Sequence, residues 1–92
     1  MLFRMERSEY CVYILYSSTK AKTYVGVTQN LIARFKSHNA LGTKGYTRNY
    51  RPWIVVYVEF YSEKKRALKR EKALKSGQGR EWIKNFILQQ YQ

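Results

Sequence analysis

Several residue types are scarce in this sequence, and the scarcity excludes whole classes of site. It has no aspartate, only 6 acidic residues, which are all glutamate, and one histidine and one cysteine among 92 residues. A disulfide framework, a cysteine-based zinc site and a histidine-based metal cluster are therefore excluded. Six scattered glutamates also hardly supply the convergent carboxylates that a two-metal hydrolytic centre needs.

Long apolar stretches are missing as well. No segment approaches the roughly 18 apolar residues of a membrane-spanning helix, and residues 1–9 are of mixed charge without an apolar signal region. With Cys11 as the single cysteine, a reducing compartment is the natural location. We therefore expect a cytoplasmic protein, with association with the nucleoid as a further option, and no membrane partner.

Positive charge is what the sequence has in excess. The 18 Lys+Arg give a net charge of +12 and a pI near 10.0, which indicates a polyanionic partner, nucleic acid before membrane. Hydrophobic residues make up 45% of the chain, so it should fold. We expect one domain over residues 1–92 with a core from about 10 to 90. A ribosome-associated or structural basic protein is the plain alternative.

Three β-branched and aromatic runs predict strands. The first two, residues 10–16 and 23–28, are separated by a polar turn and should form a hairpin. Gly26 inside the second run predicts a bulge or a close backbone approach. The third and strongest run, residues 53–60, follows Pro52.

Capping residues predict the helices. Asn30 is placed to cap a helix over residues 31–38, and Ser62 a second helix that Gly77 would end in the left-handed conformation. A last helix is expected over about residues 80–90. The order ββαβαα predicts an α+β fold with a small three-stranded, mainly antiparallel sheet flanked by helices.

Glu71 is unusual because it should face inward in a very basic helix. On a helical projection one stripe holds Ala67, Leu68, Glu71 and Leu74. A carboxylate there costs free energy unless it is paired, hydrogen-bonded or bound to a metal. One Mg²⁺ held by one carboxylate, waters and substrate phosphates is feasible. Glu59, on the third strand, is the only other candidate for a buried acid.

Four further residues are of a type that can do chemistry. Arg34 and His38 are four residues apart and share a helix face, although a polar surface pair is the simpler interpretation. The hydroxyls of Tyr13 and Tyr24 can meet across the hairpin if the register allows, or the two are ordinary strand residues. A phenol with a pKa near 10 is a poor base unless a cation lowers that pKa.

A basic loop precedes the third strand. It interleaves cations and rings in the order Lys44, Tyr46, Arg48, Tyr50 and Arg51. Cations of this kind meet phosphates, and the rings can stack on bases. The alternative is a solvated basic loop without a partner.

Together these motifs resemble the GIY-YIG nuclease superfamily, in particular its small stand-alone members, and are similar to the N-terminal nuclease domain of the excision-repair subunit UvrC. The likeness runs from about residue 10 to 82. Its pieces are Cys11-Val12-Tyr13 with the leading Gly and Ile replaced, Tyr24-Val25-Gly26, Arg34 with His38, Lys44-Gly45-Tyr46-Thr47, and Arg70-Glu71-Lys72.

The resemblance implies a metal-dependent endonuclease that hydrolyses phosphodiester bonds, in DNA rather than RNA. Glu71 would hold one Mg²⁺ or Mn²⁺, and Arg34 would stabilise the developing negative charge. One of Tyr13 and Tyr24 would be the general base, and His38 would assist by hydrogen bonding. The sequence does not say which tyrosine takes that role.

The remaining expectations concern contacts with nucleic acid, the source of specificity and a rival hypothesis. Contacts to nucleic acid are expected from Lys44, Tyr46, Thr47, Arg48 and Arg51. Specificity would come from a protein partner or from substrate shape, or would be low. The rival hypothesis is a nucleic-acid-binding module of the same fold that no longer cleaves.

Overall fold

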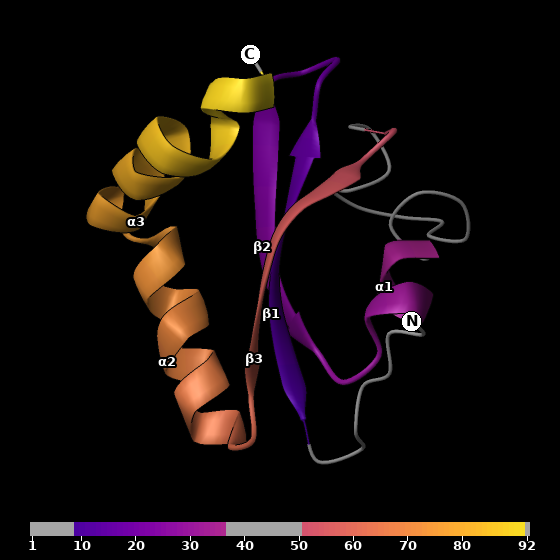
Figure 1. Ribbon diagram of the computed structural model, residues 1–92, viewed down its shortest axis with the longest axis vertical. Coiled ribbons are helices and arrows are strands. Elements are labelled where there is room, and N and C mark those ends of the chain that lie inside the picture. The colour runs from indigo at the N-terminus through magenta and orange to yellow at the C-terminus, as the bar shows by residue number, and fades with distance from the viewer. Residues whose placement is uncertain (1–8, 37–50, 92) are drawn as a thin grey trace.

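The centre of the protein is a three-stranded antiparallel sheet (Figure 1). The computed structural model describes residues 9–36 and 51–91. Its strands are β1 (Tyr10–Ser17), β2 (Lys22–Thr28) and β3 (Ile54–Tyr61), in the order β2-β1-β3. The predicted hairpin and the strand bounds are confirmed to within one residue.

The middle strand, β1, is the most buried element of the sheet. Residues 11–17 are all buried, as their nearly continuous apolar sequence requires of a strand covered on both faces. Against β2, Tyr13 is paired with Gly26 and Leu15 with Tyr24. Against β3 the register shifts between Ile14 and Leu15, so the irregularity of the sheet lies there and not at Gly26.

Helices cover both faces of the sheet, on opposite sides in Figure 1. The short helix α1 (Leu31–Lys36) packs on the face that carries Tyr13, through Leu31 and Phe35. The helices α2 (Lys64–Lys75) and α3 (Gly77–Trp82) pack on the other face. The order ββαβαα and the α+β class are therefore confirmed.

Two predicted caps of α2 are wrong. The residue before the helix is Glu63, in extended conformation and without a side-chain cap, so Ser62 does not cap it. Gly77 does not end the helix in a left-handed turn either. The chain leaves α2 at Ser76, whose hydroxyl accepts the Gly79 N–H at 3.1 Å and so starts α3 at once.

The last helical region accordingly begins earlier than residue 80. After α3 it continues as a π-helical turn, η3 (Ile83–Ile87), and a 3₁₀ turn, η4 (Leu88–Tyr91). Gly79 permits the early start, since a Cβ there would lie 2.5 Å from the Leu74 carbonyl oxygen. None of the helices within the described ranges is long and apolar enough to span a membrane.

Candidate active site at the edge of the sheet

The Tyr13 ring occupies the centre of the candidate site. It is 1% exposed and packs with Cys11, Leu15 and Trp53. The ring lies over Gly26, where a Cβ would be only 2.6 Å from its Cζ and 3.0 Å from its Cε1. Of the two predictions for Gly26, the close approach is confirmed, since only glycine leaves room for this ring.

Tyr24 is the diagonal neighbour of Tyr13 on the same face of the hairpin. The two ring centroids are 6.3 Å apart with an interplanar angle of 29°. Trp53, which the sequence analysis did not assign to the site, holds the Tyr24 ring from the other side, edge to face at 6.2 Å. Tyr24 is half-buried and Tyr13 is 1% exposed, so Tyr24 is the more accessible of the two to water.

Arg34 reaches the site from α1. The Asn30 side chain accepts the Ala33 N–H at 3.1 Å and caps the helix as predicted. Leu31 and Phe35 then anchor α1 on the Tyr13 cluster, which leaves Arg34 exposed beside it. A six-residue helix is marginal by itself, so this packing is what positions the guanidinium.

Glu71 reaches the site from α2, which packs against both β2 and β1. Its side chain is 22% exposed, and the Lys75 ammonium lies 3.1 Å from its Oε2. The predicted stripe is correct for Ala67 and Leu74, which are buried, but wrong for Leu68, which is 44% exposed. At about 100° per residue, Glu71 is about 40° from Ala67 and Leu68 is about 100° away, which places Glu71 at the margin of the buried face.

The pKa of Tyr13 shows that these groups act on one another. Burial raises this pKa, Tyr24, Glu71 and Cys11 raise it further, and only Arg34 lowers it. The charges of α1 and α2 therefore meet at one phenol, although the helices lie on opposite faces of the sheet. Because the net shift is upward, the Tyr13 hydroxyl is protonated at neutral pH and is suited to donate a hydrogen bond.

Glu59, the second candidate for a buried acid, is fully engaged elsewhere. It accepts hydrogen bonds from the Tyr57 hydroxyl and from the Tyr61 hydroxyl at 2.5 Å, and it pairs with Arg70 at 2.9 Å. Burial alone would raise the pKa of Glu59, but the bonds from Arg70 and the two tyrosines outweigh it and lower that pKa. Arg70 also stacks over the Trp82 ring at 5.2 Å, so the cluster ties β3 to α2 and α3.

A divalent cation fits Glu71 better than any other acid within the described ranges. Those ranges hold no group of three or more histidine, cysteine or acidic side chains. Glu71 is a hard oxygen donor that is 22% exposed and pairs with Lys75, which lines an open cleft together with Tyr24, so waters and phosphate oxygens can complete the coordination. Lys75 now neutralises this carboxylate, and a metal ion would compete with it.

Five of the predicted site residues lie outside the described residues: His38, Lys44, Tyr46, Thr47 and Arg48. Arg51 is described and half-buried, two positions before Trp53. The structure places the rings of Tyr13 and Tyr24 in contact, and the charges of Arg34 and Glu71 both affect the pKa of Tyr13. Sequence reasoning did not find Trp53 or Lys75, although Lys75 lies four residues after Glu71, the spacing at which a helical ion pair forms.

Comparison with known proteins agrees with the fold. Residues 9–85 match the family described as the GIY-YIG catalytic domain. The chain is similar to UPF0213 protein SH2523 of Staphylococcus haemolyticus, with 42% identity over 53 residues that cover 58% of this chain and 65% of that protein. It is also similar to UPF0213 protein CPE1444 of Clostridium perfringens, with 43% identity over 65 residues that cover 70% and 68%.

A solved structure is similar as well. The solution NMR structure of UPF0213 protein BH0048 from Bacillus halodurans superimposes with a TM-score of 0.50 and 27% sequence identity, and the match covers 82% of this chain and 81% of that one. The sequence and structure matches therefore both lead to UPF0213 proteins.

Proposed function

The chain belongs to the GIY-YIG family, and from this premise we propose that it is an endonuclease that hydrolyses phosphodiester bonds, in DNA rather than RNA. Members of this family are nucleases that act on nucleic acid and generally use a divalent metal. One observation carries the proposal. Arg34 and Glu71 come from opposite faces of the sheet, and both act on the Tyr13 phenol, beside half-buried Tyr24. A site that only bound phosphate, without cutting, would have no use for a carboxylate among its basic residues.

We assign the charged residues by the charge that develops in the reaction. Glu71 would hold the cation, Mg²⁺ or Mn²⁺, which when bound neutralises the phosphate and the leaving oxygen. Arg34 is exposed and anchored through its neighbours on α1. It is therefore preorganised to stabilise negative charge on the non-bridging oxygens, an effect on the scale of about 10²-fold or more in rate.

Accessibility separates the two tyrosines. Tyr24 is half-buried and lines the open cleft, so we assign it the contact with the attacking water, as general base. Tyr13 is buried and its pKa is raised. We therefore assign it a hydrogen bond that orients the water or the phosphate.

The substitution in the first motif is compatible with activity. Cys11 stands where the family has glycine, and its side chain is completely buried with Leu15 and Trp53. It fills the core next to Tyr13 and leaves the Tyr13 ring over Gly26. We therefore propose that Cys11 at this position leaves the catalytic arrangement in place.

Substrate choice follows from charge and from the loop. The net charge of +12 and the predicted phosphate contacts of Lys44, Arg48 and Arg51 favour nucleic acid of any sequence. The predicted base-stacking residue is Tyr46, with Thr47 beside it. We propose that a protein partner or the shape of the substrate supplies the specificity, and that the protein works in the cytoplasm or at the nucleoid.

The test is cleavage of labelled duplex, flapped and single-stranded DNA and RNA with Mg²⁺, with Mn²⁺ and with chelator. Glu71→Gln should abolish metal-dependent cleavage with the fold intact, because the amide keeps the shape and loses the charge. Glu63→Gln is the matched control, since Glu63 is also on the α2 side, is exposed and pairs with a cation, Arg66, at 3.8 Å. Wild-type cleavage by Glu71→Gln would remove this residue from the mechanism.

Phenylalanine variants test the assignment of the tyrosines. Tyr24→Phe should lose about 10²–10⁴ in rate, the usual contribution of a general base, and should keep its affinity for the substrate. Tyr13→Phe should lose less. If both variants cut normally, neither hydroxyl takes part. A wild-type protein that binds nucleic acid but cuts no substrate with either metal would instead be a binding module.

A further inference from the structure

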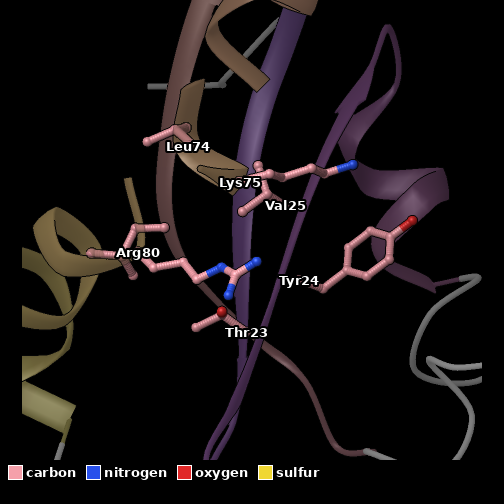
Figure 2. A pocket seen from close by; sticks show the side chains of 7 residues that line it. Thr23, Tyr24, Val25, Leu74, Lys75 and Arg80 are labelled. Carbon is pink, nitrogen blue, oxygen red and sulfur yellow. The ribbon is translucent and has the colours of Figure 1, made fainter. Parts of the chain in front are cut away.

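A groove runs along β2 away from the candidate active site (Figure 2). It begins as a cleft of about 330 Å³ lined by Tyr24 and Lys75 at one end and by Thr23 and Arg80 at the other. Leu74 and Ile83 also line it. In Figure 2 the Arg80 side chain extends from the C-terminal helices toward Thr23. This cleft therefore runs from β2 at Tyr24, whose ring points away from Arg80 in Figure 2, to a guanidinium outside the proposed site.

A second cleft continues the first. It has a volume of about 440 Å³, shares Thr23, Arg80 and Ile83 with the first, and extends to Lys22 and Lys84. We call the two together the Arg80 groove. Its walls are β2 on one side and the C-terminal helical region on the other, so its shape is open and elongated.

Within the part of the chain that the structure describes, the cations of the Arg80 groove have no acidic partner, as is true of several other exposed lysines. Within the described ranges, carboxylates pair with Arg66, Arg70 and Lys75. No ion pair within those ranges involves Lys22, Arg80 or Lys84. All three are exposed, so nothing has to be displaced before an anion binds them.

Their arrangement is unfavourable without an anion. Arg80 and Lys84 are four residues apart along the C-terminal helical region, and like charges at this spacing cost about 0.2–0.5 kcal/mol. Lys22 adds a third positive charge to the same cleft. A solvated helix face would account for Arg80 and Lys84, but not for a cation on the opposite wall.

We propose that the Arg80 groove binds the phosphodiester backbone of the nucleic-acid strand next to the bond that is cut, with Arg80 as its main contact. This inference rests on the proposed function, because it takes the Tyr24 end of the groove as the place of cleavage. Guanidinium groups bind phosphate oxygens in a bidentate manner, and the Thr23 hydroxyl is a second donor on the facing wall.

The length of the groove sets which phosphates it contacts. Lys22 and Tyr24 are two residues apart on β2, about 7 Å along a strand. The groove therefore reaches phosphates immediately next to the scissile bond. A small anion would not need an open groove of this length, whereas a polymer backbone does.

The experiment measures the affinity for a labelled DNA duplex against salt concentration, in chelator so that no strand is cut. Each duplex phosphate contact contributes about 0.9 to the slope of log affinity against log salt. Arg80→Gln/Lys84→Gln should lower the slope by about 1.8. The charge-preserving variant Arg80→Lys/Lys84→Arg should leave it near the wild-type value.

Two variants serve as controls. Lys64→Gln/Lys65→Gln removes the same charge from exposed positions at the other end of α2 and should change the slope little. Lys22→Gln removes the facing charge without touching the C-terminal helices, and should lower the slope by about 0.9. It keeps the test valid if the double variant does not fold, which circular dichroism would reveal.

The outcomes separate this inference from the proposed function. If the slope falls equally for Lys64→Gln/Lys65→Gln and Arg80→Gln/Lys84→Gln, or if Lys22→Gln leaves it unchanged, the groove is not a backbone site, whether or not the protein cuts. If the groove variants lower the slope as expected but the wild-type protein cuts nothing, the Arg80 groove is a backbone-binding site, while the endonuclease proposal and the placement of the groove beside a scissile bond both fail.

Discussion

Replacing Gly26 by alanine tests the geometry on which the candidate site depends. The new methyl group would lie 2.6 Å from Cζ and 3.0 Å from Cε1 of Tyr13, where carbon atoms prefer about 3.5–4.0 Å. The ring cannot retreat easily, because it is buried among Cys11, Leu15 and Trp53. Either the Tyr13 ring or the β1–β2 pairing must therefore shift by about 1 Å.

The cost can be bounded from two opposing effects. Overpacking of a tight core costs about 1–3 kcal/mol, while Gly→Ala restricts the unfolded chain and returns about 0.4–1 kcal/mol. We therefore expect a net loss of about 1–2 kcal/mol in the free energy of unfolding. In a domain of this size that lowers Tm by about 4–16 °C.

Activity should fall more steeply than stability. A displacement of about 1 Å in a catalytic arrangement can cost about 10²-fold in rate, and both hydroxyls of the stacked pair Tyr13 and Tyr24 depend on this contact. Affinity for the nucleic acid should be retained, because Gly26→Ala changes no charge. Thermal denaturation and cleavage of a labelled duplex at a temperature where the variant is folded measure the two effects.

Gly77→Ala is the matched control, since a Cβ at this position meets nothing within 4 Å. It should leave activity unchanged and leave stability equal or slightly higher, because alanine is the better helix former. In the background of Tyr13→Ala, Gly26→Ala should cost less than alone, with a coupling of about 0.5–3 kcal/mol. A Gly26→Ala protein with wild-type Tm and rate would refute the placement of the Tyr13 ring over residue 26.

Three further predictions concern other parts of the structure. Glu59→Gln should cost about 1–3 kcal/mol at pH 7. Folding lowers the pKa of Glu59, so the full cost should be seen above the unfolded pKa of about 4.3, and the cost should shrink as pH falls through the lower folded pKa. Urea unfolding at pH 7 and pH 3 measures this difference. A cost independent of pH would contradict the pairing with Arg70. Lys75→Met should lower the Mn²⁺ concentration for half-maximal cleavage by about 1.4- to fivefold, since an exposed ion pair contributes about 0.2–1 kcal/mol. An unchanged metal titration would mean that Lys75 does not compete for Glu71. Gly79→Ala should lower the free energy of unfolding by about 1–3 kcal/mol or more. The new Cβ would lie 2.5 Å from the Leu74 carbonyl oxygen, and the backbone cannot move aside as a side chain can. Equal Tm values for this variant and Gly77→Ala would contradict the close packing of α3 on α2.

The errors of the sequence analysis all lie where local signals meet tertiary packing. Ser62 and Gly77 are good capping residues in isolation, but Ser76 takes the capping role because α3 has to fold back on α2. Leu68 is apolar yet 44% exposed, because the buried face of α2 is narrow and centred on Ala67 and Leu74. A helical projection gives the order of residues around a helix, but the partner surface decides how wide the buried stripe is.

The candidate site was predicted in its residue types but not in its contacts. Tyr13, Tyr24, Arg34 and Glu71 were selected from motif order and spacing; the structure stacks the two tyrosines, and the role of the set as a catalytic site stays a prediction. No local pattern pointed to Trp53, because its contact with Tyr24 joins β2 to the residue just before β3, and these two strands are not paired with each other. For Gly26 the sequence left a bulge and a close approach as equal options, and only the register opposite Tyr13 decided between them.

The sequence by itself determined the element types, their order and the basic character, because hydrophobic periodicity, capping residues and net charge are properties of short segments or of composition. The tertiary structure alone decided which charges are satisfied. Glu59 and Arg70 are 11 residues apart and pair only because α2 packs beside β3, whereas Arg80 lies across a groove from β2 and pairs with no acid among the described residues. Ion pairs and grooves depend on distances between elements remote in the chain, and those distances arise only when the sheet and its helices pack together.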